Sequence, residues 1–99
     1  MNASIAFRPE AEADVLETYA WYESQQSGLG ETFVDFVDEA LNRIKAMPRM
    51  YPVAIRNIRR AKIGKFPYLV FYRVLPQHIE IIGILHGSRN PKLWQQRIS

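Results

Sequence analysis

The sequence predicts an α+β fold in the order β-α-α-β-β-β, with a two-helix hairpin packed on a small, twisted antiparallel sheet. Apolar residues recur at helical spacing through residues 10–47, then alternate or run continuously as in strands from residue 53 to residue 86. Short breaks containing proline and glycine separate these strand-like runs, as in hairpin connections. Two helices followed by consecutive strands are typical of the α+β class, and 99 residues suit one domain, residues 1–99.

The N-terminal half predicts a strand and two helices. Ser4–Phe7 is a short strand that Pro9 ends, and a proline also suits the first turn of a helix. This first helix is expected to end near Gln25–Ser27. The second helix starts at residues 31–32 and stops at Pro48. It has the clearest apolar stripe of the chain: Phe33, Phe36, Val37, Ala40, Leu41, Ile44 and Met47.

The C-terminal half predicts three strands in an antiparallel meander. Val53–Ile63 alternates, so it is expected to be one strand with a half-apolar face and a basic face. Tyr68–Leu75 is rich in strand-forming residues, and His78–His86 is so apolar that it is expected to be a central strand. Pro91–Arg97 could add a short helical turn. The basic face of the first of these strands carries Arg56, Arg60 and Lys62, together with Ile58.

Charge divides the chain sharply. Residues 1–40 contain nine acidic side chains against one arginine, whereas residues 41–99 contain twelve lysines and arginines against one glutamate. The net charge of +3 therefore hides an acidic half of −8 and a basic half of +11. A basic face of this kind attracts nucleic acid or an acidic protein, so charge alone does not name the partner.

Composition excludes several classes of function. There is no cysteine, which excludes a disulfide framework, a thiolate metal site and a cysteine nucleophile. Two histidines without supporting carboxylate spacing predict no metal site, and no motif predicts a cofactor. No apolar run reaches the length of a membrane span, and the N-terminus turns acidic where a signal peptide needs an apolar stretch. A cytoplasmic protein without a membrane partner is expected.

The C-terminal third carries a family resemblance. Two helices precede a basic strand, followed by "FPYLVFYRV", "IEIIGILHGSRNP" and a final "W..R". This arrangement resembles the RelE/ParE superfamily, the small toxins of type II toxin–antitoxin modules, over nearly the whole chain. The resemblance implies a toxin that is held inactive by a cognate antitoxin.

The superfamily divides by mechanism. RelE-type members cleave mRNA on the ribosome with basic and aromatic residues, because the reaction needs a base for the ribose 2′-OH, donors for the phosphorane and an acid for the leaving oxygen. ParE-type members are known for poisoning DNA gyrase by protein contact. If the chain is RelE-like, the resemblance gives the catalytic candidates as Arg60, Lys62, His86 and Arg89.

Two departures favour the ParE-like branch. Leu69 follows Tyr68 where a ribonuclease member typically has arginine, and Trp94 stands where the ribonuclease branch has a tyrosine. An indole N–H is not a useful acid or base. Half of a ribonuclease site is therefore present at best, and whether the protein is an enzyme stays open.

Several side chains are candidates for binding the target or the antitoxin: Trp21, Arg56, Arg60, Lys62, Arg89 and Trp94. Each has a simpler alternative. The basic residues could form a solvated strand face, Arg89 could lie in an ordinary turn, and Trp94 could anchor the tail on the sheet. Likewise, His86 could make a structural hydrogen bond at a strand end.

Three functions remain open at this point. The favoured one is a ParE-like toxin that inhibits DNA gyrase, and the runner-up is a RelE-like endonuclease that acts on the ribosome and mRNA. The third is a non-toxic basic binding or adaptor domain. The first two share a cognate antitoxin, which would offer an amphipathic helix or an extended, acidic segment to the basic half.

Overall fold

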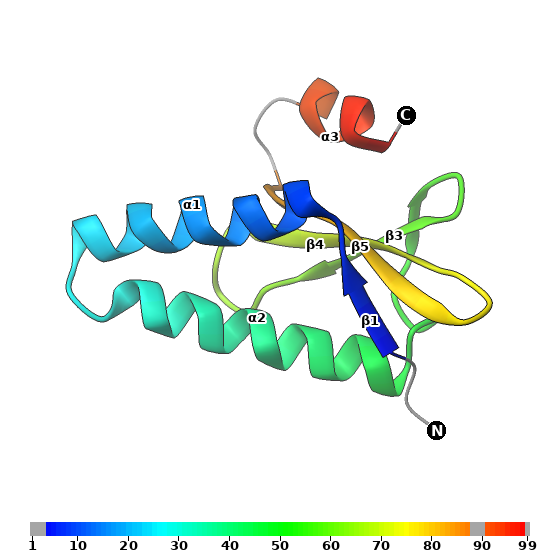
Figure 1. The fold of residues 1–99 in the computed structure, drawn as a ribbon, viewed down its shortest axis with the longest axis horizontal. Coiled ribbons are helices and arrows are strands. Elements are labelled where there is room, and N and C mark those ends of the chain that lie inside the picture. The colour runs from blue at the N-terminus through cyan, green and yellow to red at the C-terminus, as the bar shows by residue number, and fades with distance from the viewer. Residues whose placement is uncertain (1–3, 88–90, 99) are drawn as a thin grey trace.

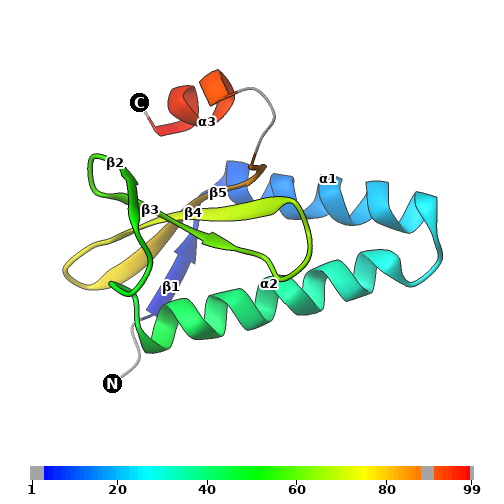
Figure 2. The ribbon, with the colours of Figure 1, turned by 180° about the vertical axis from the view of Figure 1, so that it is seen from behind.

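The computed structural model describes residues 4–87 and 91–98. A sheet carries two long helices on one side and a short C-terminal helix on the other (Figures 1 and 2). The elements in chain order are β1 (Ser4–Phe7), α1 (Pro9–Gln25), α2 (Leu29–Ala46), β2 (Val53–Ile55), β3 (Ile58–Lys62), β4 (Tyr68–Val74), β5 (His78–His86) and α3 (Pro91–Ile98). The predicted α+β class and order of elements are confirmed, with one added strand and one added helix.

The two long helices form a hairpin whose turn is held by one carboxylate. Pro9 occupies the first turn of α1, where its missing N–H costs nothing. The side chain of Glu23 on α1 accepts hydrogen bonds from the backbone N–H groups of Gly28 and Gly30, both at 2.9 Å. These amides lie at the N-terminus of α2, which otherwise has no side-chain cap. Gly30 has no room for a side chain, because a Cβ there would lie 2.7 Å from the Tyr19 carbonyl oxygen.

The sheet has five strands in the order β1-β5-β4-β3-β2. Strands β2 to β5 are antiparallel neighbours, as the meander predicts, and β5 is an inner strand. However, β1 pairs with β5 in parallel, so the sheet is mixed and not purely antiparallel. The chain passes from β1 through both helices and three strands before β5 returns beside it, a pairing that local patterns do not reveal.

The prediction of one strand over Val53–Ile63 is wrong. Two residues, Arg56 and Asn57, turn the chain between Ile55 and Ile58, which pair with each other in the β2–β3 hairpin. Arg56 adopts a positive φ of 53°, which is common for the first central residue of a two-residue hairpin turn. Its side chain is therefore at a turn and not on the strand face that Arg60 and Lys62 share.

Most of the core lies between the sheet and the α1–α2 hairpin. The buried residues of this core are Ala11, Tyr22, Phe33, Val37, Ala40, Ile44, Ala61, Ile63, Phe66, Val70, Tyr72, Ile79, Ile81 and Ile84. A smaller cluster lies on the opposite side of the sheet, here called the outer face: Ile58, Phe71, Ile82 and Leu85. The aromatic rings of Tyr22, Phe33 and Phe66 contact one another at centroid distances of 5.0–5.4 Å, which fixes α1 and α2 to the sheet.

A β-bulge in β5 changes which side of the sheet its residues face. Tyr72 pairs with Ile81 and Phe71 pairs with Gly83, so Ile82 has no partner of its own on β4. Before the bulge, Ile79 and Ile81 belong to the main core, and after it Ile84 does. Regular alternation after Ile81 would place Ile84 on the outer face beside Ile82. The bulge therefore turns the residues that follow it, including His86, to the opposite side of the sheet from the one that regular alternation would give.

Candidate functional site

The basic strand residues lie on the outer face of the sheet. Arg60 and Lys62 alternate with the core residues Ala61 and Ile63, and both are exposed. The Lys62 ammonium donates hydrogen bonds to the Gly64 carbonyl at 2.8 Å and the Phe66 carbonyl at 3.1 Å. Lys62 thus holds the β3–β4 loop, while Arg60 makes no side-chain hydrogen bond or ion pair to the part of the chain that the structure describes.

His86 lies on the other side of the sheet. It pairs with Tyr68, whose ring packs on the main core, and the two rings contact each other at 5.3 Å. Residues of α1 line a small pocket together with His86. The structure therefore does not bring His86 together with Arg60 and Lys62, as an endonuclease site built from these residues would require. Arg89 and the side chain of Trp94 lie outside the described residues.

Arg97, from the C-terminal basic tail, is tied to α1. Its guanidinium donates to the Asp14 carboxylate at 2.8 and 3.3 Å, and to the Ile82 carbonyl at 3.4 Å. Asp14 also accepts the backbone N–H of Ile84 at 3.0 Å. Asp14 and Arg97 thus satisfy backbone groups of β5 beyond the end of β1. The hydrogen bond from Arg97 to Asp14 raises the pKa of the guanidinium and outweighs the opposing effect of burial.

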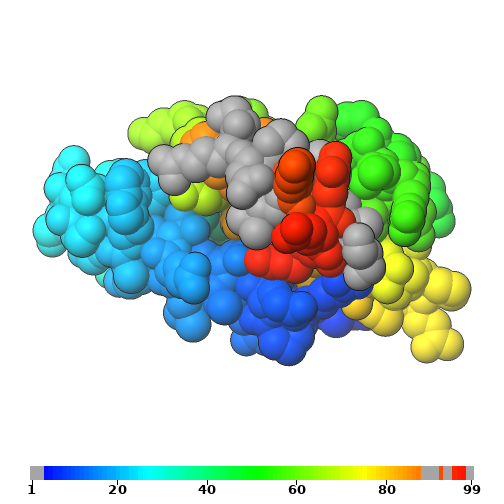
Figure 3. Space-filling view, turned by 90° about the horizontal axis from the view of Figure 1, so that it is seen from above, coloured from blue at the N-terminus to red at the C-terminus, as the bar shows by residue number. Residues whose placement is uncertain are grey.

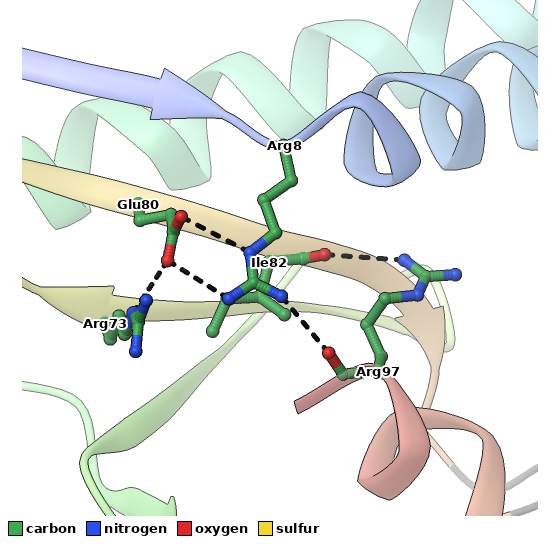
Figure 4. Close-up of polar contacts among 5 residues, drawn as sticks. All are labelled: Arg8, Arg73, Glu80, Ile82 and Arg97. Atoms are coloured by element: carbon green, nitrogen blue, oxygen red, sulfur yellow. Dashed lines mark hydrogen bonds and ion pairs between the residues drawn. The ribbon is translucent and has the colours of Figure 1, made fainter. Parts of the chain in front are cut away.

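A second charged cluster lies beside α3 on the same side of the sheet. The Glu80 carboxylate accepts from Arg73 at 2.7 Å and lies 3.3 Å from Arg8, whose guanidinium also donates to the Arg97 carbonyl at 3.2 Å (Figure 4). Burial opposes ionisation of Glu80, but the hydrogen bonds from Arg8 and Arg73 outweigh it and lower the pKa of the carboxyl. Glu80 therefore balances one of the two positive charges that Arg8 and Arg73 bring to this cluster. Seen from above, α3 lies against the start of α1 (Figure 3).

Trp21 projects from α1 beside a small pocket. Its side chain is 54% exposed, as expected for a candidate interface residue, and its ring meets that of Tyr22 edge to face at 5.0 Å. The pocket has a volume of about 250 Å³ and is called the aromatic pocket below. It is lined by Glu17, Thr18, Trp21, Tyr22, Pro67, Tyr68 and His86.

A larger apolar groove runs between the two long helices, with a volume of about 550 Å³. It is lined by Phe7, Glu12, Val15, Leu16, Val34, Val37, Asp38 and Leu41. Leu16 is 69% exposed, the most exposed large apolar side chain among the described residues. Exposed apolar grooves are common at sites of protein, membrane or ligand binding.

The predicted binding residues thus do not form one site. Trp21 lies near the C-terminal end of α1, whereas the β2–β3 hairpin that carries Arg56 lies at the opposite end of the molecule (Figure 1). Sequence reasoning missed the rest of the aromatic pocket and the helix groove. The pocket combines residues of α1 with residues 67, 68 and 86, and the groove combines residues of β1, α1 and α2, so no spacing within one element indicates them.

In residues 4–87 and 91–98, which the structure describes, none of the helices is long and apolar enough to cross a membrane. No group of three histidine or acidic side chains there is placed to hold a metal ion.

Comparison with known proteins gives consistent similarities. A family model described as the ParE toxin of the type II toxin–antitoxin system parDE matches residues 5–91. Toxin ParE2 of Mycobacterium tuberculosis, found in strains CDC 1551 and H37Rv, is 27% identical over 89 residues, which is 89% of this chain and 85% of the relative.

Two solved structures share the fold. The chromosomal ParDE system from P. aeruginosa superposes with a TM-score of 0.64 at 19% identity, over 85% of this chain and 95% of the other. The YoeB dimer from Staphylococcus aureus superposes with a TM-score of 0.57 at 17% identity, over the same shares.

Proposed function

The chain belongs to the ParE toxin family of type II toxin–antitoxin systems, and from this premise we propose that it inhibits DNA gyrase by protein contact and is neutralised by a cognate ParD antitoxin. The observation that carries the choice of gyrase is the separation of His86 from Arg60 and Lys62 by the thickness of the sheet. Without an assembled acid–base set, inhibition by binding is the simpler mechanism.

A supercoiling assay with purified gyrase tests the proposed target. Increasing toxin is expected to block supercoiling of relaxed plasmid, and antitoxin added beforehand is expected to restore it. The wild-type toxin is expected to leave translating ribosomes uncut, and Arg60→Ala and Lys62→Ala should not change this result.

Toeprinting of translating ribosomes tests the runner-up, a RelE-like endonuclease. New cuts in the A-site codon that disappear in Arg60→Ala, with gyrase unaffected at saturating toxin, would replace this proposal by the RelE-like one. Normal growth upon induction of the toxin without its antitoxin would leave only the adaptor function.

The antitoxin is proposed to bind in the α1–α2 groove with apolar side chains. The groove is apolar along most of its lining, and Leu16 stands exposed at its edge. Acidic residues of the antitoxin would then neutralise free basic side chains such as Arg56 and Arg60, which are exposed.

Leu16→Asp tests this placement. The substitution puts a charge at the edge of an apolar groove, so antitoxin affinity measured by calorimetry is expected to fall at least about tenfold. Ala20→Asp is the matched control, because Ala20 is exposed on the same helix and lines neither the groove nor the aromatic pocket. Equal affinities of the two variants would place the antitoxin elsewhere.

A further inference from the structure

The aromatic pocket has the chemistry of a site for a single basic side chain. Three aromatic rings, those of Trp21, Tyr22 and Tyr68, belong to its lining. The face of an aromatic ring attracts a cation, tryptophan most strongly, and arginine is the commonest partner. The lining also contains one carboxylate, Glu17, and no lysine or arginine.

The size of the pocket also fits one side chain. Its volume of about 250 Å³ lies below the roughly 300–1,000 Å³ of typical small-molecule sites. A long side chain inserted from a partner protein needs only such a narrow cleft. Arginine is enriched among the residues that dominate binding at protein interfaces, and such residues lie in well-packed pockets.

Part of the pocket wall is held in place before any partner binds. Tyr22 is buried and packs edge to face on Phe66 at 5.0 Å. The rim is closed by a hydrogen bond from the Gly87 N–H to the Pro67 carbonyl at 2.8 Å. A site formed in advance loses little conformational entropy upon binding, which favours affinity.

We propose that the aromatic pocket receives an arginine or lysine side chain of the protein that this toxin inhibits. The proposal rests on the proposed function in one respect, namely that the toxin acts by protein contact. The charge of the chain indicates the inhibited protein and not the antitoxin as the partner. An antitoxin segment that neutralises the basic half carries carboxylates, and Glu17 in the lining of the pocket repels a carboxylate inserted there, whereas the mainly apolar α1–α2 groove receives apolar side chains.

The first test uses small probes and needs no target protein. The tripeptide acetyl-Gly-Arg-Gly-amide is titrated into the whole toxin, and the indole N–H signal of Trp21 is followed by NMR, assigned by comparison with Trp94→Phe. A saturable shift at millimolar concentration is expected. The matched probe with citrulline, a neutral isostere of arginine, is expected to bind at least about fivefold more weakly. Equal shifts with both probes, or no shift with either, would overturn the proposal.

The second test separates the inhibited protein from the antitoxin. In Trp21→Ala and Glu17→Gln, the toxin level required for growth arrest is expected to rise about tenfold or more. The affinity of both variants for the antitoxin should stay within about twofold of wild type. Glu39→Gln, an exposed carboxylate on α2 outside both cavities, is the control. Thermal unfolding of each variant checks the fold, and Trp21→Phe, which keeps an aromatic ring, is expected to retain part of the activity.

The outcomes of these experiments distinguish the proposed role of the aromatic pocket from the proposal that gyrase is the target. Trp21-dependent growth arrest with unimpaired gyrase would reject gyrase but support the pocket. Loss of antitoxin binding with full growth arrest in both pocket variants would overturn the pocket's assignment to the inhibited protein. Folded variants with full arrest and full antitoxin affinity would overturn it too.

Discussion

At the scale of single residues, Arg56 in the turn of the β2–β3 hairpin has a backbone conformation that residues other than glycine rarely adopt. Arg56 has a φ of 53°, a region in which a side chain is strained and glycine is not. Asn57 follows it, and the pair closes the tight turn between Ile55 and Ile58. The strain is confined to Arg56, because the other residues with positive φ in the described ranges are glycines.

Substitution of Arg56 is therefore expected to follow backbone preference. Arg56→Gly should leave the free energy of unfolding unchanged or raise it by up to about 1 kcal/mol, whereas Arg56→Val should lower it by about 1–2 kcal/mol. Urea unfolding measures both. Arg60→Val is the control, since a β-branched residue fits that exposed strand position. A valine variant at position 56 as stable as the glycine variant would contradict the prediction.

Tyr72 combines complete burial with a hydrogen bond. Its hydroxyl donates to the Pro48 carbonyl at 2.7 Å, and this bond ties the end of α2 to β4. Burial raises the pKa of Tyr72 to about 12, although the nearby Arg59 acts in the opposite direction. An unfolded tyrosine loses its proton near a pKa of about 10.

Stability is therefore expected to fall at alkaline pH. Between about pH 10 and pH 12 the unfolded chain releases the Tyr72 proton while the folded protein retains it, so the free energy of unfolding decreases as pH rises. Tyr72→Phe should cost about 1 kcal/mol at pH 8 but show a shallower alkaline decline. Urea unfolding from pH 8 to 11.5 compares the slopes, and identical slopes would show that Tyr72 is not responsible.

At the scale of elements, a partly buried ion pair joins α3 to α1. The side chains of Arg97 and Asp14 are only 17% and 11% exposed, so removal of either leaves a charge with poor access to water. Arg97→Met is expected to lower the free energy of unfolding by about 2 kcal/mol and to expose α3 amides to hydrogen exchange. Lys92→Met, on the exposed side of α3, serves as control. Unchanged exchange of residues 91–98 in Arg97→Met would refute this role.

The helices and the inner strands were predictable from the sequence because their signals are local. Pro9 and Pro48 bound the helical pattern, and the stripe from Phe33 to Ile44 matches the buried face of α2. By contrast, the β2–β3 turn lacks the glycine that marks such turns, and Ile58, out of step with Ile55, was the only sign of it. The parallel pairing of β1 with β5 depends on contacts more than 70 residues apart.

At the scale of the whole molecule, the division of charge predicts how the antitoxin associates. If acidic antitoxin residues approach the basic half, the association rate should fall about tenfold between 50 and 500 mM NaCl, because salt screens long-range attraction. The dissociation rate should change less. Stopped-flow mixing measures both rates. Arg60→Glu should lower the association rate and its salt dependence, and a rate insensitive to salt would contradict electrostatic attraction.

The candidate site was less predictable than the fold, and the reason is geometric. Arg60, Lys62 and Trp21 were correctly expected to be exposed, but sequence could not tell which candidates face the same side of the sheet. That depends on strand register and on the bulge at Ile82. The pocket partners Glu17 and Tyr68 are separated by about half the chain and meet only in the folded protein.

The extra residue in β5 has a consequence for comparing members of this family. Regular alternation along β5 would turn the histidine at its end to the outer side, and the bulge at Ile82 turns it to the helix side. A relative that lacks both the extra residue and the bulge would keep its histidine on the helix side, because the bulge only absorbs the added residue. A relative of the same length without a bulge would present the imidazole to the outer side, so the role of this histidine should be assigned from strand pairing and not from the alignment alone.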